Sequence, residues 1–566
     1  MSRNLCLASL VLNLTTSIIA ADSAQRNVDR ELRNVLASHG FTGRVESTLE
    51  QRLGRALDPA KAELGRLLFF DKFVGLHGDN SCAGCHSPLN GLGDSVSMAI
   101  GVENNDFVGP QRAGPRNQRR TPSVANTAFY PRLMWNGRFS AISGDPFDNS
   151  KGFLFPAPEG TTRFPPNDPD FQHLLQAQAH IPPTELSEAA GFTGICGGTI
   201  TSSRFQQKSA EGMRLVKEAG SSKVRAVFDP LAGSAVRVFG GGGRNAPAGE
   251  PDFCQFDVPA IGRTGVPLPQ PARIARPDGG FDEFRNEQIR DVVIGRINAN
   301  ESYRAAFKTA FPDLKDDEAI DFAMFGQAIA EFEFSLTFMN APIDRFARGE
   351  SRAMSDAQKR GALTFFGKAN CVQCHAVAGG SNELFSDFQN HVAGIPQIAP
   401  KFGAGLGNVP FRNRKGQFTE DGNQDFGNFD ITGEDSDIYK FRTSPLRNLG
   451  IQPAFFHNGS FISLADGLRH HLDTLRMARL YDPVAAGVAP DLTENTGPIG
   501  PVLKRLDPLL AQPIGLTEAE FSDLEAFLRD GLLDPRALPD NLVSMIPTSV
   551  PSGLSLHTFE STPPSP

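Results

Sequence analysis

The sequence predicts a mainly α-helical protein that contains two similar units, and three observations lead to this fold class. A Gly-x-x-x-Phe-Phe segment occurs at Gly65–Phe70 and again at Gly361–Phe366. Each segment is followed by a Cys-x-x-Cys-His motif, so the repeat extends beyond a single element. Between residues 317 and 338, apolar side chains recur at spacings of three and four, the period of one helix face: Phe322, Phe325, Ile329, Phe332 and Leu336.

Residues that typically begin helices occur shortly before each Phe-Phe pair and near the end of the second unit. Asp58 is a candidate N-cap with Pro59 at the first helical position, ahead of the first Phe-Phe pair. Ser355 is the equivalent candidate before the second pair. Thr517-x-x-Glu520 is a capping box and begins a helix that we expect to run to residue 529. This last helix is predicted to close the second unit.

The composition is that of a soluble globular protein. The chain has 566 residues, 40% of them hydrophobic and 21% charged, and a net charge of −9. Nucleic acid is not an expected partner, because phosphate binding needs clustered Lys and Arg. Residues 1–24 resemble a secretory signal peptide, with an apolar stretch followed by small residues. No later apolar run is long enough to span a membrane, so we expect an exported, periplasmic protein without a membrane span in the mature chain.

The two Cys-x-x-Cys-His motifs predict two covalent haems of the c type. They are Cys82-Ala-Gly-Cys85-His86 and Cys371-Val-Gln-Cys374-His375. The spacing lets two thiols form thioethers with the two vinyl groups of a haem, while the adjacent histidine ligates the iron. One Cys-x-x-Cys pair alone is also compatible with a redox dithiol or half of a zinc site. Two copies that both carry the histidine, in an exported chain, favour two cytochrome-c-like haem domains.

Two further cysteines lie in a Gly- and Pro-rich region without clear periodicity. Cleavage of the leader removes Cys6 and leaves Cys196 and Cys254 outside the haem motifs. In an oxidising compartment a disulfide between them is the simplest pairing, and two buried free thiols are the alternative. We therefore expect a long loop-rich insertion over residues 161–285.

The predicted organisation has six parts. They are a signal peptide (1–24), a first cytochrome-c-like domain (25–160), the loop-rich insertion (161–285), a helical part that packs on the first domain (286–345), a second cytochrome-c-like domain (346–540) and a tail (541–566). The assignment of roles to the two domains comes from the resemblance described next.

Three segments resemble the bacterial di-haem cytochrome c peroxidases and their MauG-type relatives. They are LGRLLFFDKF before the first motif, RRTPSVANTAFYPRLMWNGR after it, and FRTSPLRNLGIQPAFFHNGSFISLADGLRHH in the C-terminal part. The resemblance covers most of residues 50–160 and 290–530 and leaves the insertion outside. It implies that the haem of the first motif activates hydrogen peroxide and that the second haem stores or relays electrons.

The resemblance also implies roles for individual residues. His86 and His375 become the proximal ligands of the two haems. Trp135, the only tryptophan of the chain, takes the position of the residue between the haems, where an indole shortens each electron hop. Glu159 in FLFPAPEG becomes the distal carboxylate that moves a proton between the two oxygens of peroxide.

The chain departs from the family pattern at both haems. No histidine occurs between His86 and His173, so the first haem is predicted to be five-coordinate and open, with His77 as a weak competitor. Relatives place a Met or Tyr ligand of the second haem fourteen residues after a histidine that matches His457, and that position holds His471. A bis-histidine iron has a lower potential than one with a thioether. His470 takes the role if the helix register slips, and His391 is a further option.

Calcium and the reaction itself stay open at this stage. The family holds calcium partly with an Asn, and Arg120 stands at that position, where its positive charge repels the ion. A peroxidase that takes electrons from a small cytochrome or cupredoxin is the first hypothesis. The second is a MauG-like oxidase that uses peroxide to oxidise a protein or organic substrate. A pure electron carrier and a haem oxygenase are the alternatives from other classes, and the sequence does not decide between peroxide and O2.

Overall fold

The computed structural model describes residues 26–75, 78–156, 159, 163–190, 285–400, 411, 414 and 422–562, together with five short strands between residues 214 and 284. The predicted leader, His77 and the predicted disulfide pair Cys196 and Cys254 lie outside the described residues.

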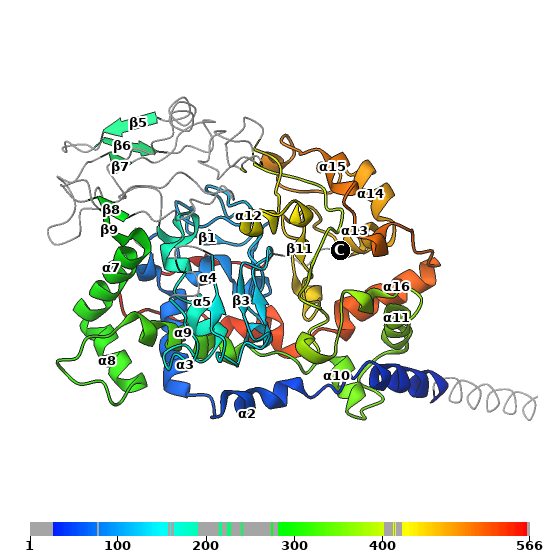
Figure 1. Cartoon of the computed structure of the whole chain (residues 1–566), viewed down its shortest axis with the longest axis horizontal. Helices are drawn as coiled ribbons and strands as arrows, with labels where there is room; N and C mark the ends of the chain where they lie inside the picture. Colours follow the sequence, from blue (N-terminus) through cyan, green and yellow to red (C-terminus); the bar gives the residue numbers. More distant parts are fainter. Residues whose placement is uncertain are drawn as a thin grey trace, which may run out of the picture.

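Helices dominate the described chain, as the sequence predicts (Figure 1). A helix described over residues 26–38 is followed by α2 (Leu49–Leu53), α3 (Pro59–Phe70), α4 (Cys82–Cys85), α5 (Leu174–Gln178), α7 (Arg285–Ala299), α8 (Glu301–Ala310), α9 (Phe322–Ser335), α10 (Pro342–Ala347), α11 (Asp356–Phe366), α12 (Phe429–Thr432), α13 (Leu464–Leu472), α14 (Thr474–Leu480), α15 (Ile499–Leu503), α16 (Glu518–Ala526) and α17 (Pro539–Leu542). No helix among the described residues is long and apolar enough to cross a membrane.

The strands are two to four residues long and connect the helices without forming an extended sheet. They are β1 (Phe107–Val108), β2 (Arg132–Leu133), β3 (Phe139–Ala141), β4 (Phe153–Leu154), β5 (Arg214–Lys217), β6 (Val224–Val227), β7 (Phe239–Gly240), β8 (Arg273–Ala275), β9 (Phe281–Phe284), β10 (Asn390–His391), β11 (Phe441–Arg442) and β12 (Thr558–Phe559). The pairs β1–β12 and β10–β11 join segments that are far apart in sequence, in parallel and antiparallel register respectively.

The first helix pair is α3 against α9. The side chain of Asp58 accepts hydrogen bonds from the first turn of α3, and Pro59 occupies its first position, so both predicted roles are confirmed. The two helices cross closely at Gly65, where a Cβ atom would lie 1.9 Å from the carbonyl oxygen of Ala328. Only glycine permits this approach without movement of a helix. The predicted apolar stripe of α9 is buried in the surrounding core.

The second helix pair, α11 against α16, repeats this arrangement in the other half of the molecule (Figure 1). Ser355 and Thr517 form the capping boxes at the starts of the two helices, as predicted. A Cβ atom at Gly361 would lie 1.9 Å from the carbonyl oxygen of Asp523. Two glycines at matching positions of the sequence repeat therefore set two equivalent helix crossings, each next to a Cys-x-x-Cys-His motif.

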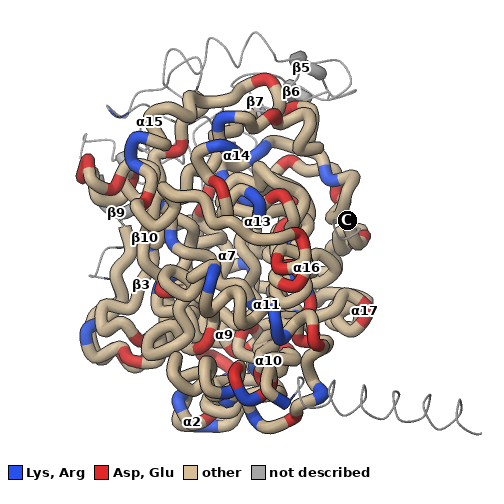
Figure 2. Tube along the Cα trace, turned by 90° about the vertical axis from the view of Figure 1, so that its right-hand side faces the viewer, with Lys and Arg blue, Asp and Glu red and all other residues tan. Residues whose placement is uncertain are grey.

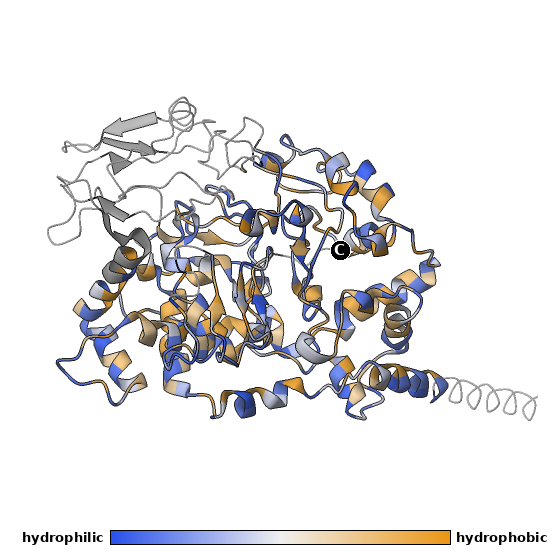
Figure 3. Ribbon diagram, in the orientation of Figure 1, coloured by the Kyte–Doolittle hydropathy of each residue, from blue (hydrophilic) through white to orange (hydrophobic). Residues whose placement is uncertain are grey.

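Residues 163–190 pack in the interior, although the sequence predicts the loop-rich insertion from residue 161. Phe164, Leu174 and Leu175 are almost fully buried in a third apolar cluster, and α5 packs on α9. Apolar residues gather in this central region and hydrophilic residues on the outer loops (Figure 3). On the side that carries α11, α13 and α16, acidic and basic residues are interspersed (Figure 2).

Candidate haem sites

A cavity of about 460 Å³ lies beside the second Cys-x-x-Cys-His motif. Cys371, Cys374 and His375 form one part of its wall, and His471 and Trp135 line it from other segments. The motif follows α11, His471 is in the last turn of α13, and Trp135 follows β2. Three segments that are distant in sequence therefore converge on one cavity.

The rings of His375 and His471 lie close together, with their planes tilted by 47°, at a distance that suits one metal ion. Their centroids are 6.3 Å apart. An iron bound to one nitrogen of each ring at about 2 Å would separate the centroids by roughly 6 Å. Nδ1 of His375 donates to the carbonyl oxygen of Phe385 (2.9 Å), and Nδ1 of His471 lies 3.3 Å from that of Gly467. These contacts leave Nε2 as the ligating nitrogen of both rings.

His470 and His391 are engaged elsewhere. His470 is buried, and its Nε2 donates to the carbonyl oxygen of Ala393 (3.1 Å). His391 lines the cavity, but its Nδ1 donates to Asp507 (2.8 Å) and its Nε2 to Asp387 (3.0 Å). The structure therefore brings His471 to His375 and gives both nitrogens of His391 carboxylate partners.

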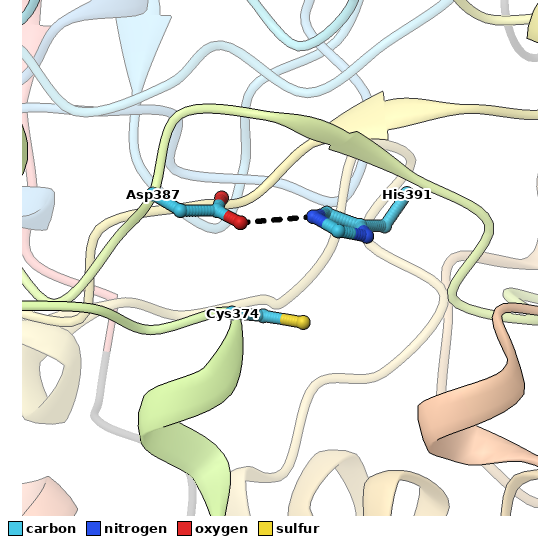
Figure 4. A group of neighbouring side chains, drawn as sticks. All are labelled: Cys374, Asp387 and His391. Atoms are coloured by element: carbon cyan, nitrogen blue, oxygen red, sulfur yellow. Dashed lines mark hydrogen bonds and ion pairs between the residues drawn. The ribbon is translucent and has the colours of Figure 1, made fainter.

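Asp387 and His391 lie next to Cys374 (Figure 4). One donor atom of each of these three residues lies within 4.8 Å of the other two. Hydrogen bonding to Asp387 raises the pKa of His391 to about 9, so the imidazole is a cation at neutral pH. Both ring nitrogens of His391 therefore have carboxylate partners, and the ring forms ion pairs with Asp387 and Asp507 beside Cys374.

Buried arginines at the cavity suit the carboxylates of a haem. Arg442 donates to the carbonyl oxygens of Met134 (2.9 Å) and Thr443 (3.1 Å), and burial lowers its pKa to about 10. Its positive charge therefore gains from an anion in the cavity. Arg447, in contrast, forms a bidentate ion pair with Asp344 in which both distances are 2.8 Å. The two thiols, the neighbouring imidazoles and the charge of Arg442 fit a c-type haem.

Trp135 is held by hydrogen bonds of both its side chain and its backbone. Its indole Nε1 donates to the carbonyl oxygen of Arg120 (2.7 Å), and its own carbonyl oxygen accepts from the backbone N–H of Arg442 (2.7 Å). The side chain of Arg120 donates to backbone and amide oxygens. A guanidinium in this position does not fit a calcium ion, because both are cations and need the same oxygen atoms.

The first motif is more deeply buried than the second. Cys82 and Cys85 form α4, and His86 follows it directly. Burial raises the pKa of the Cys82 and Cys85 thiols to about 12 and 11 and lowers that of His86 to about 4. The ring of Phe69 lies 6.2 Å from that of His86. These thiols and this imidazole are neutral and lie in apolar surroundings, which suits the attachment and ligation of a haem.

Glu159 is buried and lies beside α7. Its carboxylate is 3.3 Å from Arg290, which also donates to the carbonyl oxygen of His180 (2.9 Å). His173, the next histidine after His86, uses both ring nitrogens in hydrogen bonds, to Ala128 and from Leu175.

Two carboxyl groups that lie near the first motif were not identified from the sequence. Burial raises the pKa of Glu333 to about 8, and Glu333 acts electrostatically on Cys82. Burial together with the charge of Glu185 raises the pKa of Glu188 to about 7, and this residue acts on both cysteines of the motif. Glu333 interrupts the apolar face of α9, and a glutamate inside such a face is the one signal that could have revealed it.

Comparisons with known proteins identify the family of this chain. The family model described as di-haem cytochrome c peroxidase matches residues 59–211 and 275–352. The methylamine utilization protein MauG of Methylorubrum extorquens is 30% identical over 416 residues, which are 74% of this chain and 69% of that protein. The cytochrome-c peroxidase IdrP2 of Pseudomonas sp. (strain SCT) is 21% identical over 419 residues, 73% of each chain.

A solved structure is also similar, a MauG-like protein associated with microbial copper homeostasis. It is 20% identical, with a TM-score of 0.46 over 87% of this chain and 93% of that one. The sequence matches define an oxidoreductase of the di-haem type. The chain belongs to the family of di-haem cytochrome c peroxidases and MauG proteins.

Proposed function

We propose that this enzyme binds two covalent haems and reduces hydrogen peroxide at the first of them. Cys82 and Cys85 attach the first haem and His86 ligates its iron. The second is attached by Cys371 and Cys374. The observation that carries the proposal is the pair of rings of His375 and His471, 6.3 Å apart in the cavity beside those cysteines. When bound, the haems supply the redox chemistry, in which peroxide takes up two electrons and two protons to give two waters.

The protein residues divide the remaining tasks. His375 and His471 would both ligate the second iron, which suits electron storage and transfer. Trp135 lines the second cavity and is the proposed relay toward the first haem. Glu159 is the proposed proton-transfer group, and Arg290 holds its carboxylate in place. The predicted absence of a second histidine ligand leaves the first iron open to peroxide.

A MauG-like oxidation of a protein or organic substrate is the second candidate. The imidazole of His471, in place of a thioether, favours it, because an imidazole lowers the potential and so stabilises the oxidised iron. The relatives named cytochrome c peroxidase and those named MauG both match the chain. A reduced small cytochrome or cupredoxin as electron donor distinguishes the two reactions, because only a peroxidase turns over with it.

The proposed compartment is the periplasm. Residues 1–24 are the proposed signal peptide, and haem attachment to Cys-x-x-Cys-His motifs takes place in the exported chain. Expression with and without this segment tests the proposal. The full sequence should give a haem-stained protein in the periplasmic fraction, and the truncated one should give neither.

The ligand assignment is tested by electron paramagnetic resonance of the ferric protein, with His471→Ala and a matched variant, His470→Ala. The wild type should show one high-spin and one low-spin haem. His471→Ala should convert the low-spin signal to high spin, and His470→Ala should leave it unchanged. Stoichiometric peroxide should alter the optical spectrum of the wild type. Two low-spin haems that do not react with peroxide would refute the proposed activity and leave an electron carrier.

A further inference from the structure

The guanidinium of Arg120 is enclosed by oxygen atoms from two distant parts of the chain. Nη1 donates to the carbonyl oxygen of Val96 (2.7 Å). Nη2 donates to the carbonyl oxygen of Asp94 (3.0 Å) and to the side-chain oxygen of Gln452 (3.1 Å). Arg120 is 3% exposed. Residues 94 and 96 follow the first haem motif and residue 452 precedes His457, so the guanidinium joins the surroundings of the two candidate sites.

Backbone carbonyls and a side-chain amide oxygen are the donors that a hard cation such as Ca²⁺ takes in proteins. The side chain of Asp94 is fully buried nearby; burial raises the pKa of its carboxyl, and the charge of Arg120 acts to lower it. Without Arg120 this shell of oxygens would therefore attract a cation. Arg120 supplies a permanent positive charge with several fixed donors, and it is attached to the chain.

The backbone of the same residue fixes Trp135. The carbonyl oxygen of Arg120 accepts the indole N–H of Trp135 (2.7 Å), and the N–H of Arg120 donates to the carbonyl oxygen of His457 (2.7 Å). His457 and Trp135 both line the second cavity. The side chain of Arg120 therefore anchors the backbone segment on which the indole is held.

We propose that Arg120 is a built-in cation that takes the place of a bound metal ion between the two halves and positions Trp135 at the second cavity. Arg120 is thus a positioning residue. The proposal rests on the proposed relay role of Trp135 for its functional meaning, but its test needs no turnover. The indole of Trp135 stays in place without calcium, and the inter-haem arrangement does not respond to chelators.

The wild-type holoprotein provides the first measurement. Trp135 is the only tryptophan, so the ultraviolet resonance Raman band that reports indole N–H hydrogen bonding comes from this residue alone. We expect the same band frequency and the same ferric spectra before and after dialysis against a chelator, and after calcium is added. A band that shifts on chelation and returns with Ca²⁺ would overturn the proposal.

Arg120→Asn provides the second measurement. It removes the guanidinium and leaves the oxygen shell, to which it adds an amide oxygen. We expect the Trp135 band to shift in the chelated variant and to return toward the wild-type frequency as calcium binds, with a dissociation constant of about 10⁻⁴–10⁻³ M. Electron transfer between the haems, followed after a light pulse, should change in parallel. A variant whose band equals that of the wild type with and without calcium would refute the role of Arg120.

Arg116→Gln is the matched control. Arg116 is also buried and also joins distant segments, because it donates to the carbonyl oxygen of Met98 (3.1 Å) and to Asp491 (2.9 Å). It should lower stability without moving the Trp135 band or creating a response to calcium. If Arg120→Asn does not fold, Arg120→Lys replaces it. This variant keeps the positive charge but loses the paired N–H donors of the guanidinium. The Trp135 band should therefore shift without becoming dependent on calcium.

Discussion

The cationic state of His391 predicts a stability that depends on pH between neutrality and pH 9. The ring lies between the carboxylates of Asp387 and Asp507, and these contacts raise its pKa to about 9. Because the pKa is higher in the folded protein than the usual 6.5, the stabilisation is fully present below pH 6.5. It is lost as the pH rises through about 9.

The magnitude follows from the shift. A change from 6.5 to about 9 is 2.5 units, and each unit corresponds to about 1.4 kcal/mol, which gives about 3.5 kcal/mol. The side chain of His391 is 24% exposed, so solvent screening reduces this figure. We expect a contribution of about 2 kcal/mol at pH 6 that disappears by about pH 10.

Urea unfolding of the holoprotein and of His391→Gln between pH 6 and 10 measures this contribution. The difference in the free energy of unfolding should be largest at pH 6 and approach a constant above pH 9. His39→Gln is the matched control, because it removes an imidazole that packs on Phe366 with a centroid distance of 5.1 Å. Parallel curves for the wild type and His391→Gln would refute the assigned charge.

Three further changes test the helix crossing, the buried ion pair and the buried carboxyl. Gly361→Ala should cost about 1–3 kcal/mol of thermal stability, because its Cβ meets a carbonyl of α16, whereas Gly295→Ala has free space and should gain up to about 1 kcal/mol. Arg447→Met should lower the free energy of unfolding in urea by about 3–5 kcal/mol, and adding Asp344→Leu to this variant should recover most of the loss. An equal loss in the single and the double variant would contradict the pairing. The pKa of Glu333 is raised to about 8, so this residue makes the wild type less stable as the pH rises from 4.5 to 8. Glu333→Gln should remove this contribution to the pH dependence of the free energy of unfolding. An unchanged pH dependence in the variant would count against the raised pKa.

Local signals in the sequence were sufficient to predict the helices of the two units. Asp58, Ser355 and Thr517 cap helices as predicted, because a capping side chain acts on the N–H groups of its own first turn. The repeated glycines marked equivalent positions, but their function became visible only with the partner helix. Gly65 and Gly361 each admit a backbone carbonyl that lies more than 150 residues away.

Residues that act through distant partners could not be predicted from the sequence. Counting from His457 indicated His471, and the ring distance to His375 agrees with that choice. That His470 and His391 have other partners could not be predicted, because those partners are distant in sequence. The negative effect of Arg120 on calcium was inferable from its charge. The oxygen shell around its guanidinium was not, because Gln452 lies 332 residues away.

The charges around the two candidate haem sites differ in a way that suits the proposed direction of the reaction. Beside the first motif, Glu333 and Glu188 have raised pKa values of about 8 and 7, so at neutral pH Glu333 mostly retains its proton and Glu188 is about half protonated. Peroxide reduction consumes two protons, and these carboxyls can hold them close to the first haem. Beside the second motif, the described hydrogen bonds of the Arg120 and Arg442 side chains run to uncharged oxygens. The charge of Arg442 would favour an electron on the second haem and offset part of the low potential of a bis-histidine iron. In the proposed reaction, the charges would therefore suit proton supply at the first site and electron storage at the second.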